Sequence, residues 1–316
     1  MSKKPKSIET PGLIVPPLTP FNSKLKVDYK VLEREIDYIV DTCRASCISV
    51  SGVETSEYHY LSLEERKELI RKTVEMIDGR IPFVVGISHA SYRTSIELAG
   101  LAEELGTAAL QLLAPLRPFG GAPTTAELVR YFEAVAKETA APILLYLNPG
   151  PGADVSVPAT IELAKLDRVK YIKESSRDLS RVGRLVVDID LAGHARYFTT
   201  MQMLLATLEL GGSGATMPPP GAYIARLIVD AFNEGDLKRA AEIQREFCLF
   251  PHKWMAHGLA PVMKAAMEIA GCPVGDPYPP FEGLPAEDKK ALAAYLKTTS
   301  LFAKERRNAV GKKAVA

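Results

Sequence analysis

A lysine stands near the end of a short apolar run in the segment YIKESS, residues 171–176. An ammonium group loses much of its hydration free energy on burial unless it is paired or neutral. Lys173 therefore has two interpretations. In the first, its ammonium forms an ion pair with Glu174 or Glu57. In the second, the side chain is desolvated and has a lowered pKa, so that its free amine attacks a carbonyl carbon to form an imine. The residue pattern alone leaves both open.

A tyrosine closes another apolar run, PILLYL, in which Tyr146 is the fifth residue. Imine formation requires protons to move on and off the carbinolamine, and a phenol beside the amine can carry them. In the alternative interpretation, the ring of Tyr146 packs at the mouth of the fold and its hydroxyl faces water. A third segment, SGVETSE at 51–57, adds a threonine, serines and two glutamates after a further apolar run.

Short apolar runs alternate with amphipathic helical patterns along most of the chain. In residues 28–43 the apolar side chains fall on one helical face, and Ser62 stands three residues before Glu65, which predicts a capping box. About eight such units without a compositional break favour a (β/α)8 TIM barrel, an α/β fold. An open doubly wound sheet is less consistent, because no Gly-x-Gly-x-x-Gly follows the first run. The runs begin at Leu13, Cys47, Ile81, Ala108, Pro142, Val169, Ala195 and Gly214.

The pattern changes to helices alone after about residue 235. We predict a flexible tail at 1–11, the barrel at 12–234, an appended C-terminal helical domain at 235–302 and a mobile basic tail at 303–316. Active sites of barrel enzymes lie at the C-terminal ends of the strands. The lysine, tyrosine and glutamate segments above all close a predicted strand, so we expect them to meet at that end.

Composition argues against several classes of partner. The formal net charge is +1, with 47% hydrophobic and 24% charged residues, which gives no electrostatic basis for binding nucleic acid or a membrane surface. No apolar run approaches the roughly 20 residues of a membrane helix, and no secretory signal is evident. The four cysteines and five histidines show neither a disulfide framework nor metal-ligand spacing. We expect a cytoplasmic protein without metal or cofactor.

Six segments occur in the order and spacing of the dihydrodipicolinate synthase/N-acetylneuraminate lyase family, which the chain resembles from about Gly12 to about residue 300. This resemblance implies a barrel with a C-terminal helical domain, assembled as a homodimer or homotetramer. It also implies that Lys173 forms the Schiff base, that Tyr146 is the general acid/base, and that Thr55 and the backbone around Ser56 hold the carboxylate of a 2-oxo acid. The segments are GLIVPPLTPF, SGVETSEYHYLSLEER, GRIPFVVGIS, PILLYLNPG, YIKESS and LGGSGATMPPP.

Several positions depart from the family pattern, among them Val53 and Ser56 at the two glycines of the Gly-Thr-Thr-Gly-Glu loop, and three further departures bear on the chemistry. Glu54 replaces the first threonine of the Gly-Thr-Thr-Gly-Glu loop, and Arg117 replaces a tyrosine contributed across the dimer interface. Pro151 stands where the lysine-biosynthesis synthase has an arginine that binds its aldehyde substrate, so that activity is not expected. We predict that Glu54 and Arg117 pair across a subunit interface. In the alternative, Arg117 faces solvent and Glu54 points into its loop.

The predicted function is a Schiff-base lyase, an aldolase or a dehydratase, acting on a pyruvate-type 2-oxo acid or a 2-keto-3-deoxy sugar acid. Glu54 is a candidate base for removing the C3 proton in a dehydration, and Thr216 is expected to line the pocket at the last strand. The alternatives are a dihydrodipicolinate synthase with an altered aldehyde site and a barrel that binds oxo acids without catalysis. A metal-dependent lyase has little support in the sequence.

Overall fold

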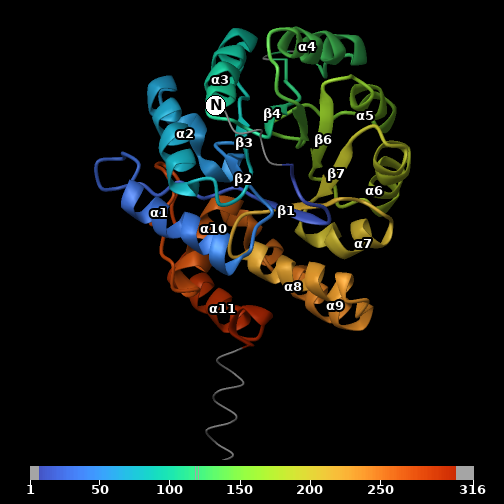
Figure 1. Ribbon diagram of the computed structural model, residues 1–316. Coiled ribbons are helices and arrows are strands. Elements are labelled where there is room, and N and C mark those ends of the chain that lie inside the picture. The colour runs from blue at the N-terminus through green and yellow to red at the C-terminus, as the bar shows by residue number, and fades with distance from the viewer. Residues whose placement is uncertain (1–6, 118, 120, 304–316) are drawn as a thin grey trace, which may run out of the picture.

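The structure is a computed structural model that describes residues 7–117, 119 and 121–303. Within these residues eight parallel strands pair in sequence order, and the eighth pairs with the first to close a barrel (Figure 1). The (β/α)8 prediction and all eight predicted strands are confirmed. The strands are β1 (Gly12–Val15), β2 (Cys47–Val50), β3 (Phe83–Gly86), β4 (Ala109–Leu113), β5 (Ile143–Leu147), β6 (Val169–Glu174), β7 (Arg196–Thr199) and β8 (Gly214–Thr216).

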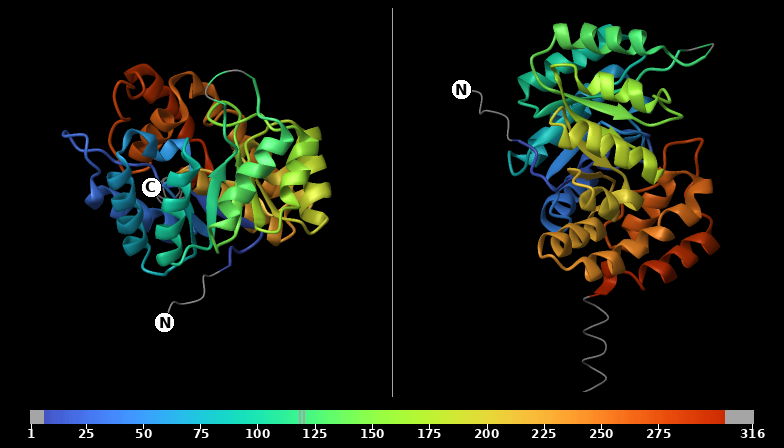
Figure 2. Two further views of the ribbon diagram at one scale, coloured as in Figure 1. Left: turned by 90° about the horizontal axis from the view of Figure 1, so that it is seen from above. Right: turned by 90° about the vertical axis from the view of Figure 1, so that its right-hand side faces the viewer.

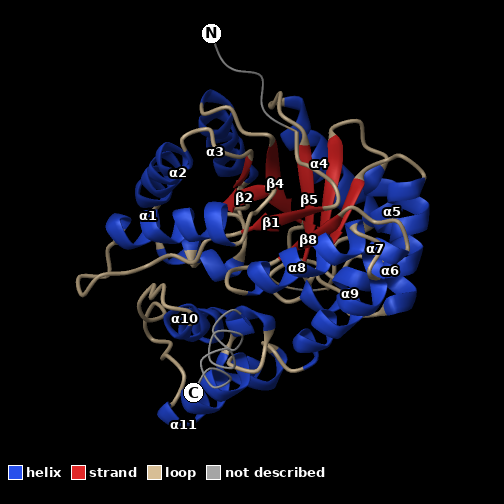
Figure 3. Ribbon diagram, turned by 60° about the horizontal axis from the view of Figure 1, so that its bottom comes forward, coloured by secondary structure: helices blue, strands red, loops and turns tan. Residues whose placement is uncertain are grey.

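Helices surround the strands, as Figure 3 shows in blue around red. The capping box predicted at Ser62 and Glu65 is present: the Ser62 hydroxyl accepts from the Glu65 N–H at 3.3 Å, and the Glu65 carboxylate accepts from the Ser62 N–H at 2.9 Å. The surrounding helices are α1 (Tyr29–Asp37), α2 (Leu63–Ile77), α3 (Tyr92–Glu104), α4 (Thr125–Lys137), α5 (Val157–Ala164), α6 (Leu179–Leu185), α7 (Leu204–Glu209) and α8 (Gly221–Asn233). Helices α1 and α6 each continue into a π-helical segment, at Tyr38–Thr42 and Val186–Leu191.

The buried face of α1 contains one residue that the apolar pattern did not indicate. Leu32, Ile36 and Ile39 are buried as expected, and Glu35 is buried with them. Its Oε1 accepts a hydrogen bond from the Leu18 N–H at 2.7 Å, and burial raises the pKa of its carboxyl to about 8. A polar side chain is placed in this face because it holds the loop that follows β1.

The interior of the barrel is filled by a small apolar set that includes Ile14, Cys47 and Phe198. Ile8, which the sequence assigns to the N-terminal tail, is buried against this set. At the seam of the barrel, a Cβ built on Gly214 would lie 2.0 Å from a backbone oxygen of β1. This position, with φ +140°, therefore requires glycine.

Within the described residues three further α-helices follow the barrel, in line with the helix-only pattern after residue 235, and they gather on one side of it (Figure 2). Helix α10 contacts the loop after β2 through Lys264. Its Nζ lies 2.6 Å from the Glu57 Oε2 and also donates to the carbonyl of Thr19. The predicted tail at 303–316 lies, except for its first residue, outside the described residues. In the described part of the chain no helix is long and apolar enough to span a membrane. The three helices are α9 (Leu237–Gln244), α10 (Leu259–Ile269) and α11 (Ala286–Leu296).

Candidate active site

Strand register brings the predicted site residues to one face of the sheet. Lys173 on β6 pairs with Tyr146 on β5 and with Phe198 on β7, and residues paired in register share a face. Phe198 belongs to the barrel interior and pairs in turn with Gly214, two residues before Thr216. Lys173, Tyr146 and Thr216 therefore all face inward at the C-terminal end of the barrel.

The amine of Lys173 is buried and lies beside the tyrosine ring. The side chain belongs to a residue that is only 7% exposed, its Nζ lies 4.1 Å from the centroid of the Tyr146 ring, and it donates to the Ser175 Oγ at 2.6 Å. Burial lowers the pKa of Lys173 to about 8, against the opposing effect of the Glu54 and Glu174 carboxylates. The neutral form of this amine, which a nucleophile requires, is therefore much more populated at neutral pH than in an ordinary lysine.

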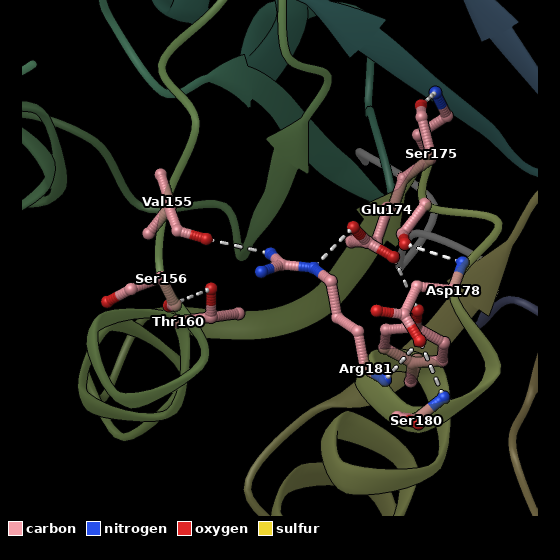
Figure 4. Close-up of polar contacts among 11 residues, drawn as sticks. Val155, Ser156, Thr160, Glu174, Ser175, Asp178, Ser180 and Arg181 are labelled. Carbon is pink, nitrogen blue, oxygen red and sulfur yellow. Dashed lines mark hydrogen bonds and ion pairs between the residues drawn. The ribbon is translucent and has the colours of Figure 1, made fainter.

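Both carboxylates proposed as ion-pair partners of Lys173 are bound elsewhere. Glu174 accepts from the Arg181 Nε at 2.9 Å and from the Tyr197 hydroxyl at 2.8 Å. Figure 4 shows the carboxylate of Glu174 directed at Arg181, with Ser175 pointing to the other side. Glu57 pairs with the lysine of α10 described above. Among the described residues, Lys173 thus has no ion-pair partner within 4 Å, and the ion-pair interpretation is not supported by this geometry.

A hydrogen-bonded chain of proton carriers extends away from the lysine. The Tyr146 hydroxyl donates to the Glu54 Oε2 at 2.5 Å. The Asn148 Nδ2 donates to the Tyr146 hydroxyl oxygen at 2.9 Å and to the same Glu54 oxygen at 3.2 Å. Burial, followed by the charge of Glu54, raises the pKa of Tyr146 well above its usual range. A proton leaving a substrate at Lys173 can therefore pass through the phenol to the carboxylate.

Glu54 and Thr55 lie in the short 3-10 helix η2 (Glu54–Ser56), directly after β2. Three buried polar atoms near the barrel mouth have no hydrogen-bond partner among the described residues: Glu54 Oε1, Thr55 Oγ1 and Thr216 Oγ1. Buried polar atoms are normally paired, so such atoms suit a polar ligand. Among all the residues that the structure describes, no group of three or more His, Cys, Asp or Glu side chains is arranged to hold a metal ion.

Ser56 and Arg117 make other contacts than those predicted for them. The Ser56 hydroxyl donates to the Pro17 carbonyl at 3.0 Å, and its N–H donates to the Val53 carbonyl at 3.0 Å, so Ser56 holds the loop. To bind a substrate carboxylate as well, the hydroxyl or the N–H of Ser56 would have to donate to two acceptors at once. Arg117 donates to Glu127 at 2.6 and 2.8 Å within its own chain. Its pairing with Glu54 of another subunit stays a prediction.

The sequence interpretation missed two members of this cluster, Asn148 and Ser175. Each stands two residues after a predicted site residue, Tyr146 and Lys173 respectively. Alternate residues of an extended chain point to the same side. The signal was therefore available, but only after the strand assignment and the inward face were known.

Comparison with known proteins identifies the family of this chain. The model of the dihydrodipicolinate synthetase family matches residues 9–299. A 4-hydroxy-tetrahydrodipicolinate synthase from Moorella thermoacetica is 31% identical over 291 residues, which cover 90% of this chain and 97% of that protein. E. coli YagE, solved in complex with pyruvate, is 25% identical with a TM-score of 0.85 and covers 93% of this chain and 100% of its own.

N-acetylneuraminate lyase from Mycoplasma synoviae shares the fold, with a TM-score of 0.78 at 23% identity over 92% of this chain and 97% of that one. The family match spans the barrel and the helices that follow it, and it includes the strand ends that carry the lysine and the tyrosine. On this coverage, and on identity above 30% along nearly the whole length of a relative, the chain belongs to the dihydrodipicolinate synthetase family.

Proposed function

We propose that this protein is a lyase that forms an imine between Lys173 and the carbonyl carbon of a 2-oxo acid. The observation that carries the proposal is a buried amine with a lowered pKa beside the Tyr146 ring. Family membership supports it, as does the solved complex of the relative YagE with pyruvate. The hydroxyls of Thr55 and Thr216, which lack partners among the described residues, suit the carboxylate of such an acid.

The chemistry follows from the order of the groups. The neutral amine of Lys173 attacks C2 of the oxo acid, and the carbinolamine loses water with protons carried by Tyr146. The resulting iminium accepts the electron pair released when the C3–C4 bond breaks or when a C3 proton is removed. In the dehydration the enamine so formed then breaks the C4–O bond, and the hydroxyl leaves as water with a proton returned by the relay. In either case the proton given up by the substrate passes through Tyr146 to Glu54, whose Oε2 already accepts from the phenol.

Aldol cleavage and dehydration start from this same iminium, so the proposed lyase can catalyse either reaction. A hydroxylated 2-oxo acid, such as a 2-keto-3-deoxy sugar acid, suits both reactions. The second candidate is a dihydrodipicolinate synthase with an altered aldehyde site, which the names of the relatives favour and Pro151 disfavours. Assaying pyruvate release, water loss and condensation with aspartate semialdehyde over a panel of 2-oxo acids separates the three reactions.

The first test is reductive trapping of the intact protein. Borohydride added in the presence of pyruvate is expected to increase the protein mass irreversibly by one reduced adduct, located by peptide mapping at Lys173. The reason is that borohydride reduces an imine to a stable secondary amine. A protein that stays unmodified under these conditions does not form the imine, and the proposed function would then be replaced by a binding barrel without catalysis.

The rate of imine formation is expected to depend on pH with a midpoint near the lowered pKa of Lys173, which is about 8. Because the neutral amine attacks, the rate should rise with pH and level off above that value. At pH 7 about 9% of such an amine is neutral, against about 0.04% for a lysine with the ordinary pKa of about 10.4. Initial rates of reductive trapping measured from pH 6 to about 10 check this, and a continued rise beyond pH 9 would contradict it.

The predicted homodimer or homotetramer gains support from an apolar patch on α6, its π-helical extension and the end of α7. We define this α6 patch by Leu179, Val187, Leu191 and Leu210, all of which are exposed. A Cβ on Gly211, next to Leu210, would lie 2.9 Å from Leu191, so the two leucines belong to neighbouring segments of one surface. Exposed apolar patches of this kind often mark subunit interfaces.

Leu191→Glu is expected to shift the protein towards smaller assemblies, because a charge would be buried in the interface. Sedimentation velocity on the variant and the parent protein measures the change. Leu237→Glu on α9 is the matched control, since Leu237 is an exposed leucine outside the α6 patch. A parent protein that sediments as a fully active monomer would contradict both this patch and the predicted interface role of Arg117.

A further inference from the structure

We propose that Asn148 is a positioning residue that orients the hydroxyl proton of Tyr146 towards Glu54 and so aligns the proton relay between them. The inference rests on the proposed function, since it concerns the relay of that site. Neither the family pattern nor the sequence interpretation assigns a role to this residue. Its amide nitrogen contacts both Tyr146 and Glu54, the two members of the relay.

The hydrogen-bonding capacities of the three groups allow one arrangement. The carboxylate oxygen of Glu54 only accepts, whereas an amide nitrogen offers two N–H groups. The Nδ2 of Asn148 lies 3.2 Å from Glu54 Oε2 and 2.9 Å from the Tyr146 oxygen, so its two hydrogens meet both acceptors. The opposite amide orientation would place the Asn148 carbonyl oxygen against the carboxylate, where two acceptors repel each other.

This arrangement determines where the single phenol proton lies. Because Asn148 donates to the phenol oxygen, the O–H of Tyr146 is directed at Glu54, which it reaches at 2.5 Å. The remaining acceptor direction of the phenol oxygen is then available for a proton from the substrate on Lys173. The proton of the phenol moves to Glu54 as the substrate proton arrives, and the reverse movement returns a proton to the substrate carbon.

Asn148 also stabilises the phenol oxygen during the transfer. Any negative charge that develops there strengthens the N–H···O bond from Asn148, because hydrogen bonds to charged groups are stronger than neutral ones. This bond is the one influence of Asn148 on the titration of Tyr146, and it lowers a pKa that burial and Glu54 raise. Without it, the partly negative phenol oxygen that forms during the transfer would lie at a higher free energy.

The backbone around Asn148 is held independently of its side chain. The Asn148 carbonyl accepts from the Gly152 N–H at 3.0 Å, and the Ala153 N–H donates to the Ala114 carbonyl at 3.0 Å. The loop after β5 therefore keeps these bonds when the amide is replaced. Asn148→Leu, which has the same branching and no polar atoms, is expected to fold.

The experiment follows the exchange of pyruvate methyl protons with D2O by proton NMR, a reaction that needs the imine and the relay but no second substrate. Asn148→Leu is expected to slow this exchange roughly 10- to 100-fold, the range for losing a hydrogen bond to a charged group. The final yield of borohydride adduct at Lys173 should stay at the parental level. Asn22→Ala is the control, because it removes an asparagine that accepts from two backbone N–H groups of an exposed turn.

A double variant tests whether Asn148 and Glu54 act together. If both serve one relay, Asn148→Leu combined with Glu54→Gln should slow exchange by much less than the product of the single effects. Unchanged exchange in Asn148→Leu would overturn the proposal. Equal losses of exchange and of adduct would also overturn it, since they indicate a structural role only. Failure of the proposed function is recognised separately, because the parent protein would then form no adduct.

Discussion

Lys173→Met is expected to abolish both the borohydride adduct with pyruvate and turnover of any 2-oxo acid. Methionine fills a similar volume without an amine, so the barrel should fold. Without a nucleophile at the end of β6, no iminium can form, and the later steps lose their electron sink. Intact-protein mass spectrometry after reduction measures the adduct, and a pyruvate-release assay measures turnover.

The matched control is Lys170→Met on the same strand. The side chain of Lys170 is 52% exposed and its closest carboxylate oxygen, on Asp167, is 4.0 Å away. This variant should form the adduct like the parent protein. An adduct that survives in Lys173→Met would place the nucleophile elsewhere. Lys264 is also buried, but its Nζ is held by Glu57 and by the carbonyls of Thr19 and Asp276.

The second large effect is expected for Glu54→Gln. The glutamine oxygen can still accept from the Tyr146 hydroxyl, but it cannot take up the proton, so the relay ends at the phenol. Turnover should fall by roughly 10²- to 10⁴-fold, the usual contribution of a positioned base, with a much smaller change in KM. Steady-state kinetics on the substrate identified by the panel give both quantities.

Glu64→Gln is a suitable control, because the side chain of Glu64 is 77% exposed and pairs with Lys67 on the surface of α2. It removes the same charge without touching the relay. A small and equal change of kcat and KM in Glu54→Gln would show that this carboxylate does not accept the proton. The role of Glu54 would then be limited to supporting its loop.

Local patterns in the sequence were sufficient to predict the fold. Each strand is a short apolar run, and each helix has its own repeat and, at Ser62, its own cap; these depend on neighbours a few residues away. The exceptions are residues whose environment is supplied by distant segments. Glu35 is buried because it accepts from the backbone of the β1 loop, and Ile8 is buried because the barrel interior receives it.

The positions of Lys173 and Tyr146 were predictable because both close a strand and the strands of a barrel end at one face. Their resemblance to family motifs added the expected chemistry. The surroundings of Glu54 were not predictable in the same way. The alternatives for this residue were an arginine of another subunit or its own loop, whereas within the chain it contacts Tyr146 and Asn148.

By itself the sequence determined the order of strands and helices, the strand ends that carry an amine, a phenol and a carboxylate, and the family pattern they resemble. Only the tertiary structure decided how these groups are paired. Glu174 is bound to Arg181 while Lys173 is left without an ion-pair partner among the described residues, and Glu54 bonds to a tyrosine 92 positions away. The physical reason is that alternation and capping act over a few residues, whereas burial and hydrogen-bond partners depend on closure of the barrel. Closure brings side chains from segments far apart in the chain within hydrogen-bonding distance of one another.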